Sequence, residues 1–131
     1  MIRDMQDSDL REVALNDPAV AFLPHHRSIV IDDKVVAIYG YQTVCPGVGQ
    51  CWIAVNPRSA RYPLAIIRAG RELSRIAIRK FDLHRLQTAV LARDSGMNRM
   101  MALLGFTAEC VLEKASADGS DVVMYRMFKG E

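Results

Sequence analysis

The sequence predicts an α/β fold in which one domain, residues 1–131, forms a mixed, mostly antiparallel sheet of about seven strands flanked by helices. Three observations predict this fold. Half of the 131 residues are apolar, which suits a single hydrophobic core. Segments rich in β-branched residues alternate with segments of helical period. Predicted hairpins on both sides of a strand-helix-strand unit place antiparallel flanks around a parallel pair.

The first half of the chain is predicted to consist mainly of strands. Ser8 and Asp9 are suited to cap a helix. β-Branched residues on both sides of Asp32 and Asp33 predict a hairpin, and "CPGVG" turns the chain into a further strand. The predicted elements are, in order, a strand at 2–5, a helix at 8–15, the hairpin strands 27–31 and 34–44, and a strand at 50–56.

The second half is predicted to alternate helices and strands. Over residues 64–80 the apolar positions recur with helical period, which predicts a helix with one buried face and one arginine-rich face. The buried face is predicted to contain Ile66, Ala69, Gly70, Leu73, Ile76 and Ala77, and the exposed face Arg68, Arg71, Arg75 and Arg79. A strand at 82–92, a helix at 94–104 ended by Gly105, and a hairpin of 106–115 and 121–128 around Asp118 and Gly119 follow.

The composition argues against several classes of function. A formal net charge of +2 is too small to predict nucleic-acid binding. We expect a cytoplasmic protein, since no apolar run is long enough for a signal peptide or a membrane span. The three cysteines lack the spacing of a zinc site, and the three histidines lack that of a metal-binding pair. We therefore expect neither a disulfide framework nor a metal.

Three segments together resemble a known family. The segments "IRDMQDSDLREVA", "WIAVNP" and "DSGMNRMMALLGF" are similar, in order and spacing, to motifs of the GNAT superfamily of acyl-CoA-dependent N-acetyltransferases. The resemblance covers nearly the whole chain. The segment "GQCWIAVN" also looks like a degenerate GNAT-like set found among internal virion proteins of short-tailed phages.

The resemblance implies that acetyl-CoA binds where two neighbouring parallel strands diverge. Backbone amides near Ile53 and Val55 would then polarise the thioester carbonyl. The pyrophosphate would lie at the start of the following helix. Where the family has its first glycine this chain has Pro63, which has no N–H to donate. Arg58 and Arg61 are the candidates to compensate in part by binding phosphate, and the alternative is that both are solvated arginines on a loop. Asp94 stands at the position of the family's asparagine.

No catalytic residue is assigned from the sequence. Met101 stands where the family often has a tyrosine acid, and methionine cannot donate a proton. The substitutes are Tyr62, Tyr125 and Cys110 as acids, and Glu72, Glu109 and Glu113 as bases. For Glu72, a surface ion pair with neighbouring arginines is the alternative.

Two hypotheses on function stay open. The first is an N-acetyltransferase that acts on an unidentified amine, and the second is an inactive GNAT-fold binding or structural protein. Trp52 either lines the acyl or amine cleft or packs in the core. The expected partners are acyl-CoA and an amine for an enzyme, and a second copy of the chain or a virion protein is a further candidate.

Overall fold

Seven strands form one sheet in the part of the chain that the computed structural model describes, which is residues 2–6, 8–9, 25–56 and 62–131. The strands are β1 (Ile2–Asp4), β2 (His25–Ile31), β3 (Lys34–Cys45), β4 (Val48–Val55), β5 (Arg85–Leu91), β6 (Thr107–Leu112) and β7 (Val122–Phe128). Their order in the sheet is β1-β2-β3-β4-β5-β7-β6. All neighbouring pairs are antiparallel except β4 and β5, which are parallel. The mixed, mostly antiparallel sheet is confirmed.

The hairpin of β2 and β3 turns at Asp32 and Asp33. Both residues have positive φ angles, +51° and +60°, as in a two-residue type I′ turn. Aspartate tolerates this left-handed backbone conformation better than most residues do. The turn type matches the right-handed twist of the two strands. The predicted hairpin is therefore confirmed, and β2 begins two residues earlier than expected.

Helix α2 (Pro63–Lys80) confirms most of the predicted amphipathic pattern. Pro63 occupies the first turn, where its missing N–H leaves no hydrogen bond unmade. Ile66, Gly70, Leu73 and Ala77 are buried, whereas Arg68, Arg71, Arg75 and Arg79 are exposed. The prediction that Ile76 packs on the sheet is wrong. Ile76 is only partly buried, and Ile78 lies in the core in its place.

Helix α3 (Ser95–Leu103) ends at the "LLGF" corner of the sequence. Gly105 has a φ of +98°, which a residue with a side chain adopts only at a cost. The N–H of Phe106 donates to the carbonyl of Met101 at 3.0 Å, and that of Gly105 to Ala102 at 3.1 Å. These two bonds form a Schellman motif, which ends the helix and turns the chain into β6. The predicted role of Gly105 is confirmed.

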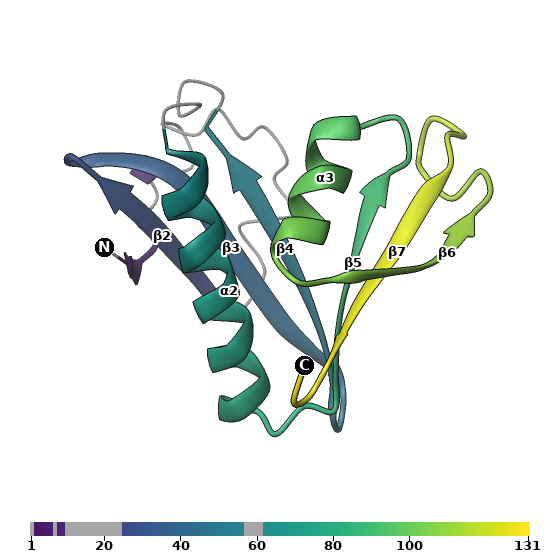
Figure 1. The fold of residues 1–131 in the computed structure, drawn as a ribbon, viewed down its shortest axis with the longest axis horizontal. Helices are drawn as coiled ribbons and strands as arrows, with labels where there is room; N and C mark the ends of the chain where they lie inside the picture. Colours follow the sequence, from purple (N-terminus) through teal and green to yellow (C-terminus); the bar gives the residue numbers. More distant parts are fainter. Residues whose placement is uncertain (1, 7, 10–24, 57–61) are drawn as a thin grey trace.

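Both helices lie on the same face of the sheet (Figure 1). The main core fills the space between helices and sheet, and Leu104 packs where a Cβ on Gly70 would stand, so the glycine lets α2 and α3 approach. The opposite face holds a smaller cluster around Val35 and Ile38. Of the helix predicted over 8–15, only Ser8 and Asp9 are among the described residues. None of the described helices is long and apolar enough to span a membrane.

Candidate functional site

Strands β4 and β5 pair over only part of their length. The parallel ladder joins Val48 to Arg85, Gly49 to Leu86 and Gln50 to Gln87, and then ends. β4 continues to Val55 and β5 to Leu91, and the two strands separate toward their carboxyl ends (Figure 1). We call this separation the β4–β5 gap and the Gln50–Gln87 end of the ladder its junction. Ligands of sheets with parallel strands commonly bind beyond such carboxyl ends.

The backbone of β4 presents hydrogen-bonding groups to the gap. The N–H of Asn56 donates to Val36 of β3 at 2.9 Å. In an antiparallel pair the residues alternate between those that bond to the partner strand and those whose N–H and C=O point away from it. Ala54 therefore bonds toward β3, and the backbone groups of Ile53 and Val55 point toward the side from which β5 has diverged.

Helix α2 begins eight residues after the end of β4, and the described part of its first turn provides no negative charge at this positively polarised start. Among the described residues no side chain caps the helix, and its first turn contains no acidic residue. The N–H of Ile66 donates to the carbonyl of Tyr62 at 3.1 Å. Leu64 and Ala65 stand in the first turn, where the N–H groups of a helix have no acceptor in the preceding turn, and Pro63 contributes no N–H. Arg58 and Arg61 lie outside the described residues.

Hydrogen bonds fix the start of α2 and tie its middle to the sheet. The hydroxyl of Tyr62 donates to Asp32 at 3.0 Å, which links the helix start to the β2–β3 turn. About three turns further on, the hydroxyls of Ser74 and Tyr39 lie 2.8 Å apart in the core, and Ser74 also donates to the carbonyl of Gly70. Tyr62 is therefore tied to the β2–β3 turn at the helix start, and its role as a substitute acid stays a prediction.

A buried polar group also lies at the junction. Cys51 and Thr88 follow the last paired residues of the ladder, and the Cys51 side chain is 3% exposed. Burial raises the pKa of the Cys51 thiol to about 12, although hydrogen bonds with Tyr39 and Thr88 oppose the rise. The thiol is consequently protonated at neutral pH, and it is a poor nucleophile there.

The positions considered for a general acid lie in different surroundings. Met101, which stands where the family often has a tyrosine, is buried in the core. Tyr125 on β7 donates its hydroxyl proton to Asn98 Oδ1 at 2.7 Å, and burial raises its pKa. Asn98 in turn donates to the carbonyl of Leu91, the last residue of β5. This Tyr125–Asn98 pair was not predicted, because its partners lie 27 positions apart in the sequence.

The three glutamates are not gathered at the gap. Arg85 of β5 donates to both carboxylate oxygens of Glu109 on β6, one of them at 3.1 Å, and this bonding lowers the pKa of Glu109. A carboxylate with a lowered pKa is a weaker base. Glu72 is exposed on α2, and in the described part of the chain it forms none of the expected ion pairs with the neighbouring arginines. Glu113 is exposed just beyond β6.

The remaining predicted residues have defined positions. Asp94 caps α3, since its side chain accepts the N–H of Met97 at 3.0 Å. Cys110 is exposed on β6, at the outer edge of the sheet. Trp52 lies over Gly40 on the face opposite the helices, 5.6 Å from the ring of His26. Within the described ranges, no group of three metal-ligating side chains is present.

Comparison with known proteins gives matches among solved structures only. Neither the models of protein families nor the curated protein sequences gave a match. The chain is similar to a GNAT-family acetyltransferase from Bacillus anthracis, with a TM-score of 0.79, 13% identity, and 99% and 95% of the two chains covered. It is also similar to Ard1 from Thermoplasma volcanium, with a TM-score of 0.79, 16% identity, and 100% and 98% covered. A third match is the ribosomal-protein-S18-alanine N-acetyltransferase of Escherichia coli, with a TM-score of 0.72, 19% identity, and 98% and 92% covered. The chain therefore has the GNAT fold.

Proposed function

We propose that this protein transfers an acetyl group from acetyl-CoA to an amine. The observation that carries the proposal is the β4–β5 gap, into which the backbone groups of Ile53 and Val55 point. The arm of acetyl-CoA contains amide groups, which can pair with exposed strand backbone as an added strand does. The GNAT-family acetyltransferases that share the fold support the same assignment.

In this proposal the start of α2 holds the phosphates. The amides of the first turn, Leu64 and Ala65 among them, and the positive end of the helix dipole suit an anion. Pro63 removes one backbone donor from this set, and Arg58 and Arg61 supply guanidinium groups in compensation. We expect weaker binding of acetyl-CoA than a glycine-rich loop gives. Asp94 is proposed to act on the cofactor indirectly, by fixing the first turn of α3 that its side chain caps.

The transfer requires one bond to form and one to break. The lone pair of the amine nitrogen attacks the thioester carbon and the carbon–sulfur bond breaks. The nitrogen loses one proton to become the amide, and the coenzyme A thiolate takes up one proton, so the reaction is balanced. The Ile53 amide is proposed to stabilise the negative charge on the carbonyl oxygen. Glu109 is a poor candidate for the base, because Arg85 holds its charge. The proposal assigns no general acid.

Calorimetric titration with acetyl-CoA tests the proposal. Each charge-assisted bond to a phosphate contributes about 1.5–3 kcal/mol, so we expect Arg58→Ala and Arg61→Ala each to weaken binding by roughly one to two decades. Pro63→Gly restores a donor and is expected to strengthen binding. Arg68→Ala is the matched control, because Arg68 is exposed farther along α2.

Two outcomes would contradict parts of this proposal. Tight binding that neither arginine change affects would show that these side chains do not hold the phosphates. No detectable binding would favour the alternative, an inactive GNAT-fold module that binds a partner protein, for which Pro63 and the buried Met101 are the supporting features. Where binding is found, release of free thiol with a panel of amines distinguishes turnover from binding alone.

A further inference from the structure

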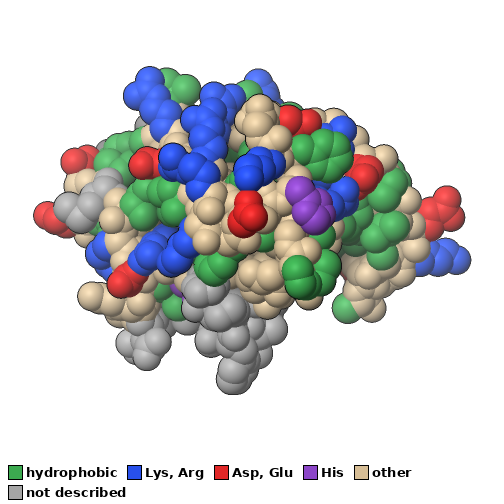
Figure 2. Space-filling model, turned by 90° about the horizontal axis from the view of Figure 1, so that it is seen from below, with side chains coloured by type: hydrophobic (Ala, Val, Ile, Leu, Met, Phe, Trp, Pro, Cys, Tyr) green, Lys and Arg blue, Asp and Glu red, His purple; other side chains and the backbone are tan. Residues whose placement is uncertain are grey.

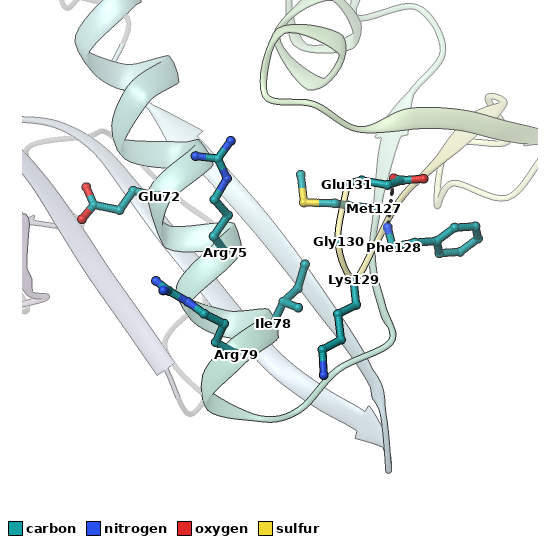
Figure 3. A pocket seen from close by; sticks show the side chains of 9 residues that line it. All are labelled: Glu72, Arg75, Ile78, Arg79, Met127, Phe128, Lys129, Gly130 and Glu131. Carbon is teal, nitrogen blue, oxygen red and sulfur yellow. Dashed lines mark hydrogen bonds between the residues drawn. The ribbon is translucent and has the colours of Figure 1, made fainter.

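An open cavity of about 770 Å³ lies between the C-terminal half of α2 and the end of β7 (Figure 3). It is lined by Glu72, Arg75, Ile78, Arg79, Met127, Phe128, Lys129, Gly130 and Glu131. The β4–β5 gap opens at the carboxyl end of β4, toward the start of α2, and a helix of 18 residues is roughly 27 Å long. The cavity is therefore distinct from the proposed acetyl-CoA site.

The inner wall of the cavity is apolar. Ile78 from α2 and Met127 from β7 lie between the two elements and point toward one another (Figure 3). Both belong to the main core and are nearly buried, with 6% and 5% of their surfaces exposed. The cavity thus ends on the edge of the hydrophobic core, where an apolar group would leave water at a gain in free energy.

Several charges at the cavity are already paired. The carboxylate of Glu131 accepts hydrogen bonds from Arg126 and from the backbone N–H of Phe128, both at 3.1 Å. The ammonium group of Lys129 donates to Asp82 at 2.9 Å. In Figure 3 the side chains of Phe128 and Glu131 turn away from α2. These residues form the rim without offering a free charge.

The charges left for a ligand are those of α2. In the described part of the chain, no carboxylate lies within 4.0 Å of the guanidinium of Arg75 or Arg79. Both residues are exposed, one helical turn apart, and Figure 2 shows Lys and Arg side chains gathered along one edge of the molecule. Glu72 also lines the cavity, and in Figure 3 the side chains of Glu72 and Arg79 both extend away from β7, whereas that of Arg75 runs along α2. Two positive charges and one negative charge remain, which matches a ligand with a single negative charge.

We propose that this cavity binds a small organic monocarboxylate with a short aliphatic chain. The planar guanidinium group of Arg75 pairs with a carboxylate through two parallel hydrogen bonds, and Arg79 adds a second positive charge to the lining. The aliphatic chain of the ligand lies against the small exposed parts of Ile78 and Met127, and its own apolar surface leaves water there. An inorganic phosphate dianion would carry one charge more than the site balances and would leave the apolar wall uncovered.

Titration with hexanoate, followed through the methyl NMR signal of Met127, tests the proposal. We expect a saturable shift of that signal, and binding of hexanol that is weaker by about tenfold or more, because hexanol lacks the charge. Arg75→Gln and Arg79→Gln are expected to weaken hexanoate binding, and the double variant to abolish saturation. Arg68→Gln is the matched control, since Arg68 lies on the same exposed face of α2 outside the cavity.

Four results would overturn the proposal. They are the absence of a saturable shift with hexanoate, equal binding of hexanol, an equal loss in the Arg68→Gln variant, and tighter binding of inorganic phosphate. The affinity for acetyl-CoA serves as an independent readout, and we expect the Arg75 and Arg79 variants to leave it unchanged. Failure here would therefore leave the proposed acetyl transfer untouched.

Discussion

Asp9 shows how one buried carboxylate can remain charged. The residue is 2% exposed, and its side chain accepts two hydrogen bonds from Arg3, at 2.8 and 2.9 Å. The backbone N–H of Gln6 and the hydroxyl of Ser28 donate to it as well. Burial raises the pKa of Asp9, but these donors and the charge of Arg3 lower it more, to about 2. The group links the end of β1 to β2.

Replacing Asp9 by asparagine is expected to lower the free energy of unfolding at pH 7 by about 2 kcal/mol, because a pKa difference of one unit corresponds to about 1.4 kcal/mol. The pKa in the folded state lies below that in the unfolded chain. The stabilisation is therefore complete above pH 4 and is lost as the pH falls toward 2. Urea denaturation between pH 2 and 7 measures this.

Asp82→Asn serves as the control for that experiment, since the side chain of Asp82 is 88% exposed and its ion pair with Lys129 lies at the surface. We expect it to change stability little. If Asp9→Asn kept the full dependence of stability on pH between 4 and 2, another carboxylate would have to account for it.

Buried polar residues also mark a limit of prediction at the scale of single residues. Hydropathy could not place Ser74 in the core, because its burial depends on hydrogen bonds to Tyr39 and Gly70. In the same way, nothing local in the sequence joins Glu109 to Arg85, 24 positions earlier, although this ion pair decides that Glu109 is a weak base.

At the scale of elements, α3 owes its short length to defined residues at its two ends. Asp94 accepts the N–H of Met97 at the start, and the Schellman motif at Gly105 satisfies carbonyls at the end. The Gly105 end was predicted from the sequence because such a glycine is a local signal, whereas Asp94 was considered only for its place in the family motif, and its role as the helix cap comes from the structure. The sequence could not decide which edge of the buried face of α2 reaches the core. Ile76 and Ile78 stand on opposite sides of that face, and tertiary packing buries Ile78.

Gly105→Ala is expected to cost about 1 kcal/mol of stability. The cost comes from the backbone, because φ is +98°, while an added Cβ would meet Met127 at an ordinary contact distance of 3.5 Å. Thermal unfolding measures it. Gly96→Ala in the first turn of α3 is the matched variant, since its Cβ would lie 3.8 Å from Asp94 and alanine favours the helix, so stability should rise. Equal effects of the two changes would contradict this explanation.

At the scale of the whole molecule, the sheet consists of two antiparallel parts. β1 to β4 form one part and β5 to β7 the other, and three residue pairs between β4 and β5 connect them. The strands and their order along the chain followed from hydrophobic periodicity. The length of the parallel ladder did not, because it depends on how two strands separated by a helix pack. The position of the gap was therefore expected only from the family resemblance, and the structure provides its geometry.

Because Cys51 is buried at the junction, the rate at which its thiol is alkylated measures how often the two parts of the sheet separate. Its thiol can react with an alkylating reagent only when the surrounding structure opens, whereas Cys45 and Cys110 are exposed and report the intrinsic rate of the reagent. Mass spectrometry of the timed reaction should find Cys51 slower by at least roughly a hundredfold. If acetyl-CoA occupies the gap, it should slow Cys51 further and leave the two reference thiols unchanged. Equal rates at all three cysteines would mean that the junction opens freely in solution, and that the closed arrangement of β4 and β5 is one of several that interconvert.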